Sequence, residues 1–457
     1  MTEPITLVLE GVLPPEREWK YTYLPFDVPQ GIGRIDVAYT YDAAIGSDPQ
    51  LQGGNTIDIG IFDSRGIEFH SPGYRGWSGS ARASFFIAQD EATPGYMPGP
   101  IQSGTWNIIL GPYKVAPQGC HYRVEVTLTP TANSITDFPA LLRLSDAPSA
   151  KVNPDGWYKG DLHCHTVNSD GDSTPQTIVR LAESLGFDFL AITDHNNCTQ
   201  NIDLAKIQTD LMLIPGYEVT TYYGHWNIWG DGGWIDFRVE SAADLASFIM
   251  EANARGYLVS CNHPRPYGPD WAFHEVSGFQ CVEVWNGPWE LLNSICLEFW
   301  EAKLRKGERL TAVGGSDHHF TRQDHIARLG HPTLHIYCEG QPSPAKLLQA
   351  LRAGHAFVSE SPTGARLTLN AGAAIMGDTL PRPADGSLSV SVSVKDGAGT
   401  RLQLIGASGS LTEADVASAD QQFDLTLDVS QTPYVRAQVI DPSTLNTRAL
   451  TNPIYLR

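Results

Sequence analysis

The sequence lacks any motif that would hold paired cysteines. Its seven cysteines are odd in number and scattered, and they include no Cys-x-x-Cys, so we expect free, buried thiols in a reducing cytoplasm. No apolar run approaches the length of a membrane-spanning helix, so we expect no membrane partner. The first residues show no basic stretch followed by an apolar core, so we expect no signal peptide and a cytoplasmic location.

Basic residues are also scarce. Lys and Arg number 31 against 51 Asp and Glu, which gives a formal net charge of −20. Binding to the phosphate backbone depends on Lys and Arg, so we expect no general nucleic-acid binding. An anionic substrate would have to be attracted locally, by metal ions. The length of 457 residues and an apolar content of 42% predict a globular chain of two to four domains.

The chain divides into three blocks by the period of its apolar residues. Residues 1–148 alternate apolar and polar positions between Gly, Pro, Asp and Ser, which predicts an N-terminal, jelly-roll-like β-sandwich. Residues 145–150 have the composition of a linker. Residues 362–457 return to period two, which predicts a second, smaller β-sandwich.

The central block, residues 155–360, alternates apolar strands with helical stretches. The clearest helix has Thr174 as N-cap, Pro175 at its first position and Gly186 just past its end. Such alternation predicts a (β/α) barrel with its site at the carboxyl ends of the strands. The expected fold class is therefore multidomain, α/β in the centre and all-β on both sides.

Histidines and carboxylates follow the apolar strands of this central block. His163 and His165 stand one residue apart at a strand end, so their side chains share a face. The complete set of candidate metal ligands is His163, His165, Asp170, His195, Glu218, His225, His263, Asp317 and His319. These are too many for one tetrahedral ion and suit two or three. Sites with two metal ions hydrolyse phosphate and carbonyl substrates.

The order of these motifs resembles that of the PHP (polymerase and histidinol phosphatase) superfamily of metal-dependent phosphoesterases. The segments that carry the resemblance are 161–166 with 169–171, 190–196, 214–219, 262–264 and 315–319. A finer resemblance is to the branch that includes carbaryl hydrolase. It is carried by the segments 218–221, 224–230, 282–287 and 351–354 and by the tail 450–456.

The resemblance implies a distorted (β/α)7 barrel over 155–360 and a role for each ligand. His163, His165 and Asp317 would bind one ion, Glu218 would bridge, and His263 would bind the second ion. The remaining candidates, assigned to the second or a third ion, are His195, His319, Asp170 and His225. Because no third histidine stands near Asp170 along the sequence, we expect two ions rather than three, and Zn, Mn or Fe as the metal.

Four residues are predicted to act in catalysis. Glu218 and Asp317 are implied as ligands, and His318 either turns away from the metals or donates a proton to a leaving group. Arg265 follows a His-Pro pair and either clamps an anionic oxygen or forms a surface salt bridge. His355 stands where the related branch usually has a basic residue.

The function predicted from these features is hydrolysis of a small, anionic phosphoester, either a monoester or a diester. A carbamate, carboxylic ester or amide hydrolase on the same site is the first alternative. A non-catalytic protein that binds carbohydrate or a partner through its sandwiches is the second. A homo-oligomer is compatible with the sequence, which does not decide the oligomeric state.

Overall fold

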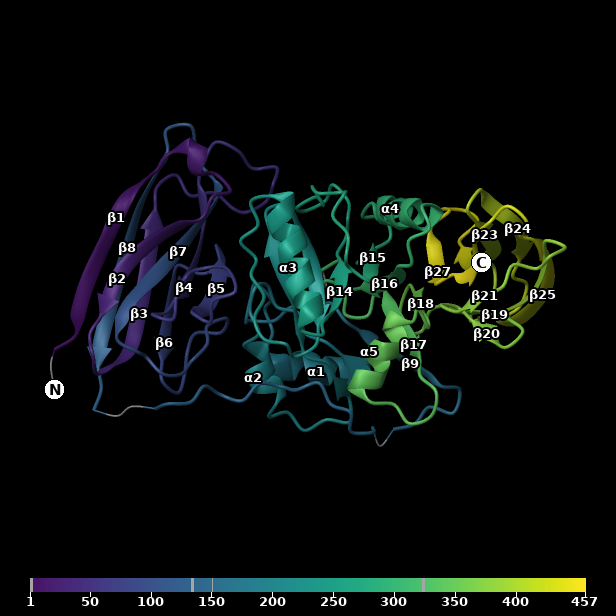
Figure 1. The fold of residues 1–457 in the computed structure, drawn as a ribbon, viewed down its shortest axis with the longest axis horizontal. Helices are drawn as coiled ribbons and strands as arrows, with labels where there is room; N and C mark the ends of the chain where they lie inside the picture. Colours follow the sequence, from purple (N-terminus) through teal and green to yellow (C-terminus); the bar gives the residue numbers. More distant parts are fainter. Residues whose placement is uncertain (1–2, 133–134, 150, 323–324) are drawn as a thin grey trace.

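A computed structural model describes residues 3–132, 135–149, 151–322 and 325–457. The N-terminal strands, the central helices and strands, and the C-terminal strands follow one another along the long axis of the molecule (Figure 1). No helix in the described ranges has the length and apolar character needed to cross a membrane.

The N-terminal region contains two antiparallel four-stranded sheets, as the period-two pattern predicts. The first has the order β1 (Ile5–Leu13), β8 (Cys120–Pro130), β3 (Ile32–Tyr41), β6 (Ser84–Ala88). The second has the order β2 (Thr22–Val28), β7 (Gly104–Lys114), β4 (Thr56–Phe62), β5 (Tyr74–Gly79). A short 3-10 helix, η1 (Pro15–Arg17), connects β1 to β2. Side chains that alternate inward from both sheets, such as Ile35 and Ile59, form one buried cluster.

The central strands form parts of two sheets. The first sheet begins in the order β11 (Met212–Leu213), β10 (Phe189–Leu190), β9 (Trp157–Asp161), β17 (Thr333–Tyr337), β18 (Ala356–Ser359). The second has the order β12 (Gly216–Thr221), β13 (Gly224–Trp229), β14 (Leu258–Cys261), β15 (Cys281–Asn286), β16 (Thr311–Gly315). The helices are α1 (Pro175–Ser184), α2 (Gln200–Leu204), α3 (Ala242–Ala254), α4 (Asn293–Arg305) and α5 (Pro344–Arg352).

The expected (β/α)7 barrel is not confirmed, because no closed sheet forms among the described residues. The strands also depart from a regular βα alternation. A tight hairpin makes β12 and β13 antiparallel, and β17 runs antiparallel to both β9 and β18. Two isolated parallel bridges, Cys164 with His318 and His195 with Glu218, connect the sheets at the strand ends.

The first central sheet continues into the C-terminal region. Strand β18 pairs with β27 (Thr447–Thr451), followed by β26 (Tyr434–Ile440), β23 (Arg401–Gly406) and β24 (Gly409–Asp415), with β28 (Ile454–Leu456) and β21 (Thr379–Leu380) to the side. A separate sheet has the order β20 (Ala374–Ile375), β19 (Arg366–Ala371), β22 (Ser387–Lys395), β25 (Asp420–Asp428). Because one sheet crosses from the central to the C-terminal region, the predicted boundary near residue 361 stays a prediction.

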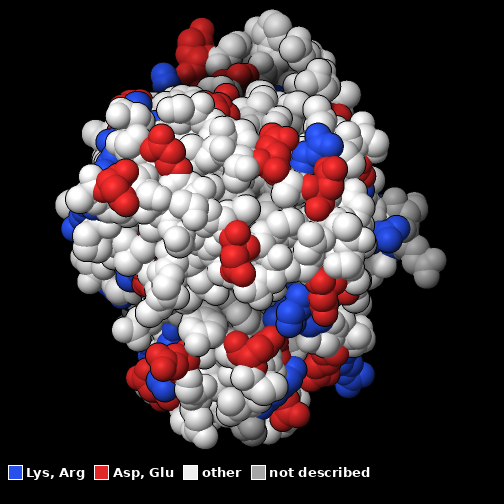
Figure 2. Space-filling model, turned by 90° about the vertical axis from the view of Figure 1, so that its right-hand side faces the viewer, with Lys and Arg blue, Asp and Glu red and all other residues white. Residues whose placement is uncertain are grey.

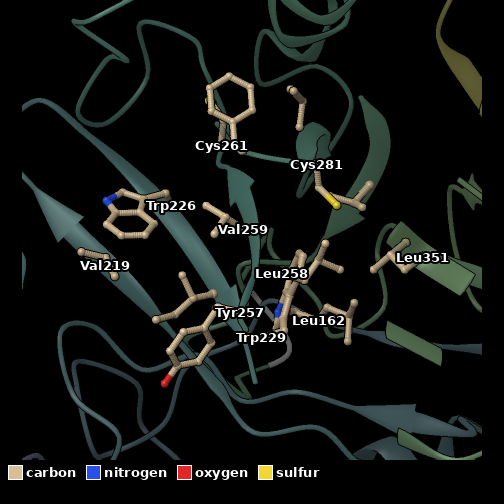
Figure 3. Close-up of a cluster of buried hydrophobic side chains, with 14 of the residues drawn as sticks. Leu162, Val219, Trp226, Trp229, Tyr257, Leu258, Val259, Cys261, Cys281 and Leu351 are labelled. Atoms are coloured by element: carbon tan, nitrogen blue, oxygen red, sulfur yellow. The ribbon is translucent and has the colours of Figure 1, made fainter. Parts of the chain in front are cut away.

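The largest buried cluster fills the central region and reaches into both neighbours. It includes Trp77 from the N-terminal sheets and Leu450 from β27. Figure 3 shows part of it, with Trp226 and Trp229 of β13 beside Val259 of β14. The indole of Trp229 donates to the carbonyl of Leu162, 2.9 Å away, which fixes the segment that leads to the predicted histidines.

Helix α1 confirms the termini predicted from the sequence. The Thr174 hydroxyl accepts a hydrogen bond from the backbone of Thr177 at 3.3 Å, and Pro175 is the first helical residue. Gly186 has a φ of 67°, the left-handed conformation that commonly ends a helix. The apolar face, which includes Ile178 and Ala182, packs into a buried cluster with the strand residue Leu190.

Candidate metal centre

The predicted ligands all converge on one place: most of them follow the carboxyl ends of central strands, while Glu218 lies within β12 and His225 near the amino end of β13. They fall into four groups whose ligand atoms lie within 4.8 Å of one another. The groups are His165, Asp170, His195 and His319; His163, Glu218 and His263; His163, His165 and Asp317; and His195, Glu218 and His225. Every candidate from the sequence belongs to at least one group.

Glu218, fully buried on β12, is the common point of two groups. Its Oε1 lies 3.4 Å from Nε2 of His163, from Nδ1 of His225 and from Nε2 of His263. Its Oε2 lies 2.9 Å from Nδ1 of His195. Although burial raises the pKa of Glu218, His163 and His225 hold it well below its usual range, so the carboxylate is ionised.

Asp317 connects the first two histidines. Its Oδ1 lies 3.0 Å from Nε2 of His165 and 3.4 Å from Nε2 of His163. Asp317 and His263 are non-glycine residues with positive φ, 52° and 28° respectively, as is Asn196 next to His195, at 54°. Such conformations persist only where the surrounding structure enforces them, and they are common at functional sites.

Asp170 completes a further group at the mouth of the cluster. Its Oδ1 lies 3.3 Å from Nε2 of His319 and 3.6 Å from Nε2 of His195. The Asp170 side chain is 45% exposed, whereas that of His163 is 1% exposed, so the cluster runs from a buried end to an open one. The expectation of two ions depended on the lack of a third histidine near Asp170 along the chain. The fold nevertheless brings two distant histidines, His195 and His319, close to Asp170.

The donor set fits divalent cations. Several buried side-chain atoms of these residues, some of them close to another ligand, form no hydrogen bond of acceptable geometry, namely His163 Nε2, His165 Nε2, His225 Nε2 and Glu218 Oε2. Buried polar atoms normally have a partner, so these atoms are arranged for something other than each other. Imidazole nitrogens mixed with carboxylate oxygens suit Zn, Fe or Mn.

Hydrogen bonds from outside the cluster orient several ligands. The amide of Asn262 donates to Glu218 Oε1 at 2.8 Å. Nδ1 of His319 donates to the carbonyl of Asp317 at 2.8 Å, which leaves its Nε2 free to face Asp170. Partners of this kind fix the ring orientation and tautomer of histidine ligands.

Glu283, on β15, is a site residue that the sequence did not single out. Its Oε1 lies 2.7 Å from Nδ1 of His163, and its Oε2 accepts from the backbone of His263 at 3.2 Å. A Cβ added to Gly315 would lie 2.4 Å from both Glu283 Oε1 and His163 Cβ, so the pair depends on glycine at this position. A carboxylate between valines on a fully buried strand was the available signal, because buried charges need a partner.

The structure excludes one of the two roles predicted for Arg265. It is 3% exposed, so it does not form a surface salt bridge. Its guanidinium donates to the Asn286 carbonyl at 3.1 Å, to Asn286 Oδ1 at 2.6 Å and to Asn293 Oδ1 at 2.7 Å, so it holds a loop. The clamp on an anionic oxygen stays a prediction. Asn286 in turn donates to Asp317 Oδ2 at 3.3 Å. Arg265 therefore acts on the cluster through Asn286.

His318 turns away from the cluster, the first of its two predicted orientations. Its Nδ1 bonds to the carbonyl of Ala327 at 2.9 Å, and it belongs to none of the ligand groups. Asp194 also faces away from the ligands: it accepts from the Thr166 backbone and the Ser169 hydroxyl, both at 2.7 Å, and so fixes the loop between His165 and Asp170.

Part of the central region matches a known family model. Residues 161–258 match the family model described as PHP domain. The match contains His163, His165 and Glu218, while His263 and Asp317 lie beyond its end.

Among curated proteins, a 5'-3' exoribonuclease Rnm from Salmonella typhimurium is 38% identical over 106 residues, covering 22% of this chain and 36% of the relative. A protein of the same name from Escherichia coli is 36% identical over 105 residues, with the same coverage. This chain thus spans about a third of the length of these relatives.

Among solved structures, a two-domain protein from Bacteroides vulgatus, containing a predicted PHP-like metal-dependent phosphoesterase, is similar at 18% identity and a TM-score of 0.38. The likeness covers 69% of this chain and 99% of that one. An amidohydrolase from Chromobacterium violaceum is similar at 17% identity and a TM-score of 0.27, over 44% of this chain and 97% of that one.

Proposed function

We propose that this chain is a metal-dependent phosphoesterase that cleaves phosphodiesters, with the four ligand groups holding three divalent ions. The observation that carries the proposal is the convergence of His, Asp and Glu side chains from separate strands, several with unpartnered buried atoms. The PHP domain match supports this class of hydrolase. The name of the curated relatives, exoribonuclease, favours a diester over a monoester.

The chain's own residues would hold and orient the ions. Glu218 would bridge the buried pair, and Asp317 would connect His163 with His165. Asp170 and His319 would complete the open position. Such ions, when bound, act as Lewis acids and lower the pKa of water toward neutrality. Glu283 and Asn262 would keep His163 and Glu218 in their binding orientations.

Hydrolysis of RNA is the second candidate, because the curated relatives carry the name of a 5'-3' exoribonuclease. Those names disagree with our expectation of no general nucleic-acid binding. Figure 2 shows the face at the C-terminal end of the molecule, on which acidic and basic side chains are scattered among uncharged residues without a continuous basic stripe. Hydrolysis of a carbamate or carboxylic ester at the same centre stays open as a further alternative.

The test is hydrolysis by the full chain loaded in turn with Mn, Zn and Fe. We expect turnover of bis-p-nitrophenyl phosphate to exceed that of p-nitrophenyl phosphate and of an aryl methylcarbamate. Asp317→Asn should reduce turnover more than about 100-fold together with the metal content. Asp415 is an exposed carboxylate on β24, so Asp415→Asn is the matched control and should change neither turnover nor metal content. Faster cleavage of the carbamate would overturn the phosphoesterase assignment.

A further inference from the structure

A cavity of about 600 Å³ lies between the N-terminal sheets and the metal centre. At its inner end it is lined by Asp170, His195 and His225, ligand candidates from two of the four groups. At its outer side it is lined by N-terminal residues, including Trp77 and Tyr113. A molecule whose reacting group sits at the cluster would therefore place its remaining part against the N-terminal sheets.

Aromatic rings form much of this wall. Trp77 and Tyr113 come from β5 and β7, Tyr222 comes from the hairpin between β12 and β13, and Phe320 follows His319. The Tyr113 and Tyr222 rings stack with centroids 5.6 Å apart, and the Tyr21 ring also stacks on Tyr222, with centroids 5.7 Å apart. Rings held in this way offer flat, apolar contact area at little cost in conformational freedom.

The described lining contains no Lys or Arg. Lys114, next to Tyr113 in the chain, donates instead to the carbonyls of Gly46 and Asp48. Asp58 adds a carboxyl group to the wall. Grooves that bind single-stranded nucleic acid combine stacking rings with a basic track along the backbone, and this cavity has the rings without the track.

The wall is fixed in place by hydrogen bonds between the two regions. The Tyr222 hydroxyl donates to Asp58 Oδ2 at 2.8 Å. The Tyr74 hydroxyl donates to the carbonyl of Asn196, next to His195. The backbone of Gly95 donates to the Thr199 hydroxyl at 3.2 Å. A binding surface that is formed before the ligand arrives loses less free energy to ordering.

We infer that this cavity binds an uncharged, ring-bearing arm of a small phosphodiester, whose phosphate lies at the metal centre. The inference deepens the proposed function and rests on it. The volume suits a ligand of one or two rings and lies within the usual range for small-molecule sites. In this arrangement the metal ions attract the phosphate. The N-terminal sheets select the substrate by contacts with its apolar part.

The experiment measures binding by calorimetry to the metal-loaded full chain, with diphenyl phosphate and dimethyl phosphate as matched probes. We expect diphenyl phosphate to bind at least about tenfold more tightly, because its ring buries apolar area that a methyl group does not. Tyr113→Ala and, as a second variant, Phe320→Leu should each reduce this ratio severalfold. Tyr337→Ala removes a half-buried tyrosine that contacts Trp157 away from the cavity, and it should leave the ratio unchanged.

A 5'-phosphorylated RNA oligonucleotide is the third probe, and at physiological salt it should bind more weakly than diphenyl phosphate. Equal binding of the two small diesters, or tighter binding of the RNA, would overturn the inference. Because the readout is binding, it is separate from hydrolysis. A preference for diphenyl phosphate without turnover of any diester would reject the proposed function and keep the pocket. Turnover of a diester without a preference for diphenyl phosphate would keep the proposed function and reject the pocket.

Discussion

His163 and Glu283 form a 2.7 Å contact between an imidazole Nδ1 and a carboxylate Oε1, inside a site where both side chains are almost fully buried. The contact directs the other ring nitrogen, Nε2, toward Glu218 and Asp317. Burial lowers the pKa of His163, but Glu283 and Glu218 together raise it well above its usual value. A strand without a ligand of its own thus controls the orientation of a ligand on another strand.

The first prediction follows from this contact. Glu283→Gln keeps the shape of the side chain but removes its charge, so His163 loses its anionic partner. We expect metal affinity to fall about 10–100-fold, the usual effect of removing such a partner. Metal titration followed by elemental analysis measures it. Glu301→Gln, a buried carboxylate bonded to Arg436 and Tyr434, is the control: its effect should be on stability, with metal affinity unchanged.

The second prediction concerns the number of ions. Asp170 belongs only to the group at the mouth of the cluster, so Asp170→Asn should remove one ion and leave the more buried ones in place. We expect native mass spectrometry to show a stoichiometry of three in the wild type and two in the variant. Asp172→Asn alters an exposed carboxylate two residues away that accepts from Thr321, and it should keep all three. A wild type that binds only two ions would contradict the assignment.

Local sequence patterns were sufficient to predict which side chains converge at the candidate metal centre and to predict parts of the fold. His163 and His165 follow an apolar strand, and strand ends of a common sheet edge meet in space. Helix α1 could be bounded because Thr174, Pro175 and Gly186 act within one turn of its ends. The N-terminal sheets could be predicted because some of their strands, such as β1 and β8, alternate more and less exposed side chains, which gives a period of two.

Features that depend on distant residues were not predictable in this way. The valines around Glu283 indicate that it is buried, but its partner His163 is 120 positions away. The roles of Arg265 and Asp170 were predicted from their neighbours in sequence. In the fold, however, Arg265 contacts Asn286 and Asp170 contacts His319, and both partners are distant in sequence. Strands β12 and β13 form a hairpin whose residues are nearly all buried, so no alternation marks it. The cavity itself exists only because two regions dock.

The third prediction is a pH dependence of stability. Burial raises the pKa of Asp58 to about 7, although hydrogen bonds from Tyr222 and Ser80 lower it. Between pH 3.8, the ordinary pKa of an aspartate, and about pH 7, the folded state therefore keeps this proton, whereas the unfolded state has released it. Stability from this group is present at low pH and is lost as pH rises through that window.

Asp58→Asn removes this contribution while keeping an acceptor for the Tyr222 hydroxyl. Relative to wild type, the variant should gain stability as pH rises from about 5 to 8, by less than about 4 kcal/mol because the side chain is partly open to the cavity. Denaturant unfolding at matched pH and saturating metal measures the difference. Parallel stability curves for the two proteins across this range would show that Asp58 titrates normally.

The fourth prediction concerns how the N-terminal sheets are held against the centre. Arg238, 2% exposed, pairs with Asp236 and donates to the hydroxyl of Tyr23 and to the carbonyls of Ile67 and Glu68. Arg238→Met keeps much of the volume but leaves Asp236 as an unpaired buried charge. We expect a loss of about 3–5 kcal/mol in unfolding free energy.

Stability alone would not distinguish a general weakening from a loss of docking. Asp236→Asn combined with Arg238→Met removes both charges, so it should recover part of the lost free energy. Because Tyr23, Ile67 and Glu68 lose the Arg238 guanidinium in either case, the preference for diphenyl over dimethyl phosphate should stay reduced in the double variant. A double variant that recovers both stability and preference would show that Arg238 only neutralises Asp236. Recovery of stability without the preference would show that the same arginine positions the wall of the cavity.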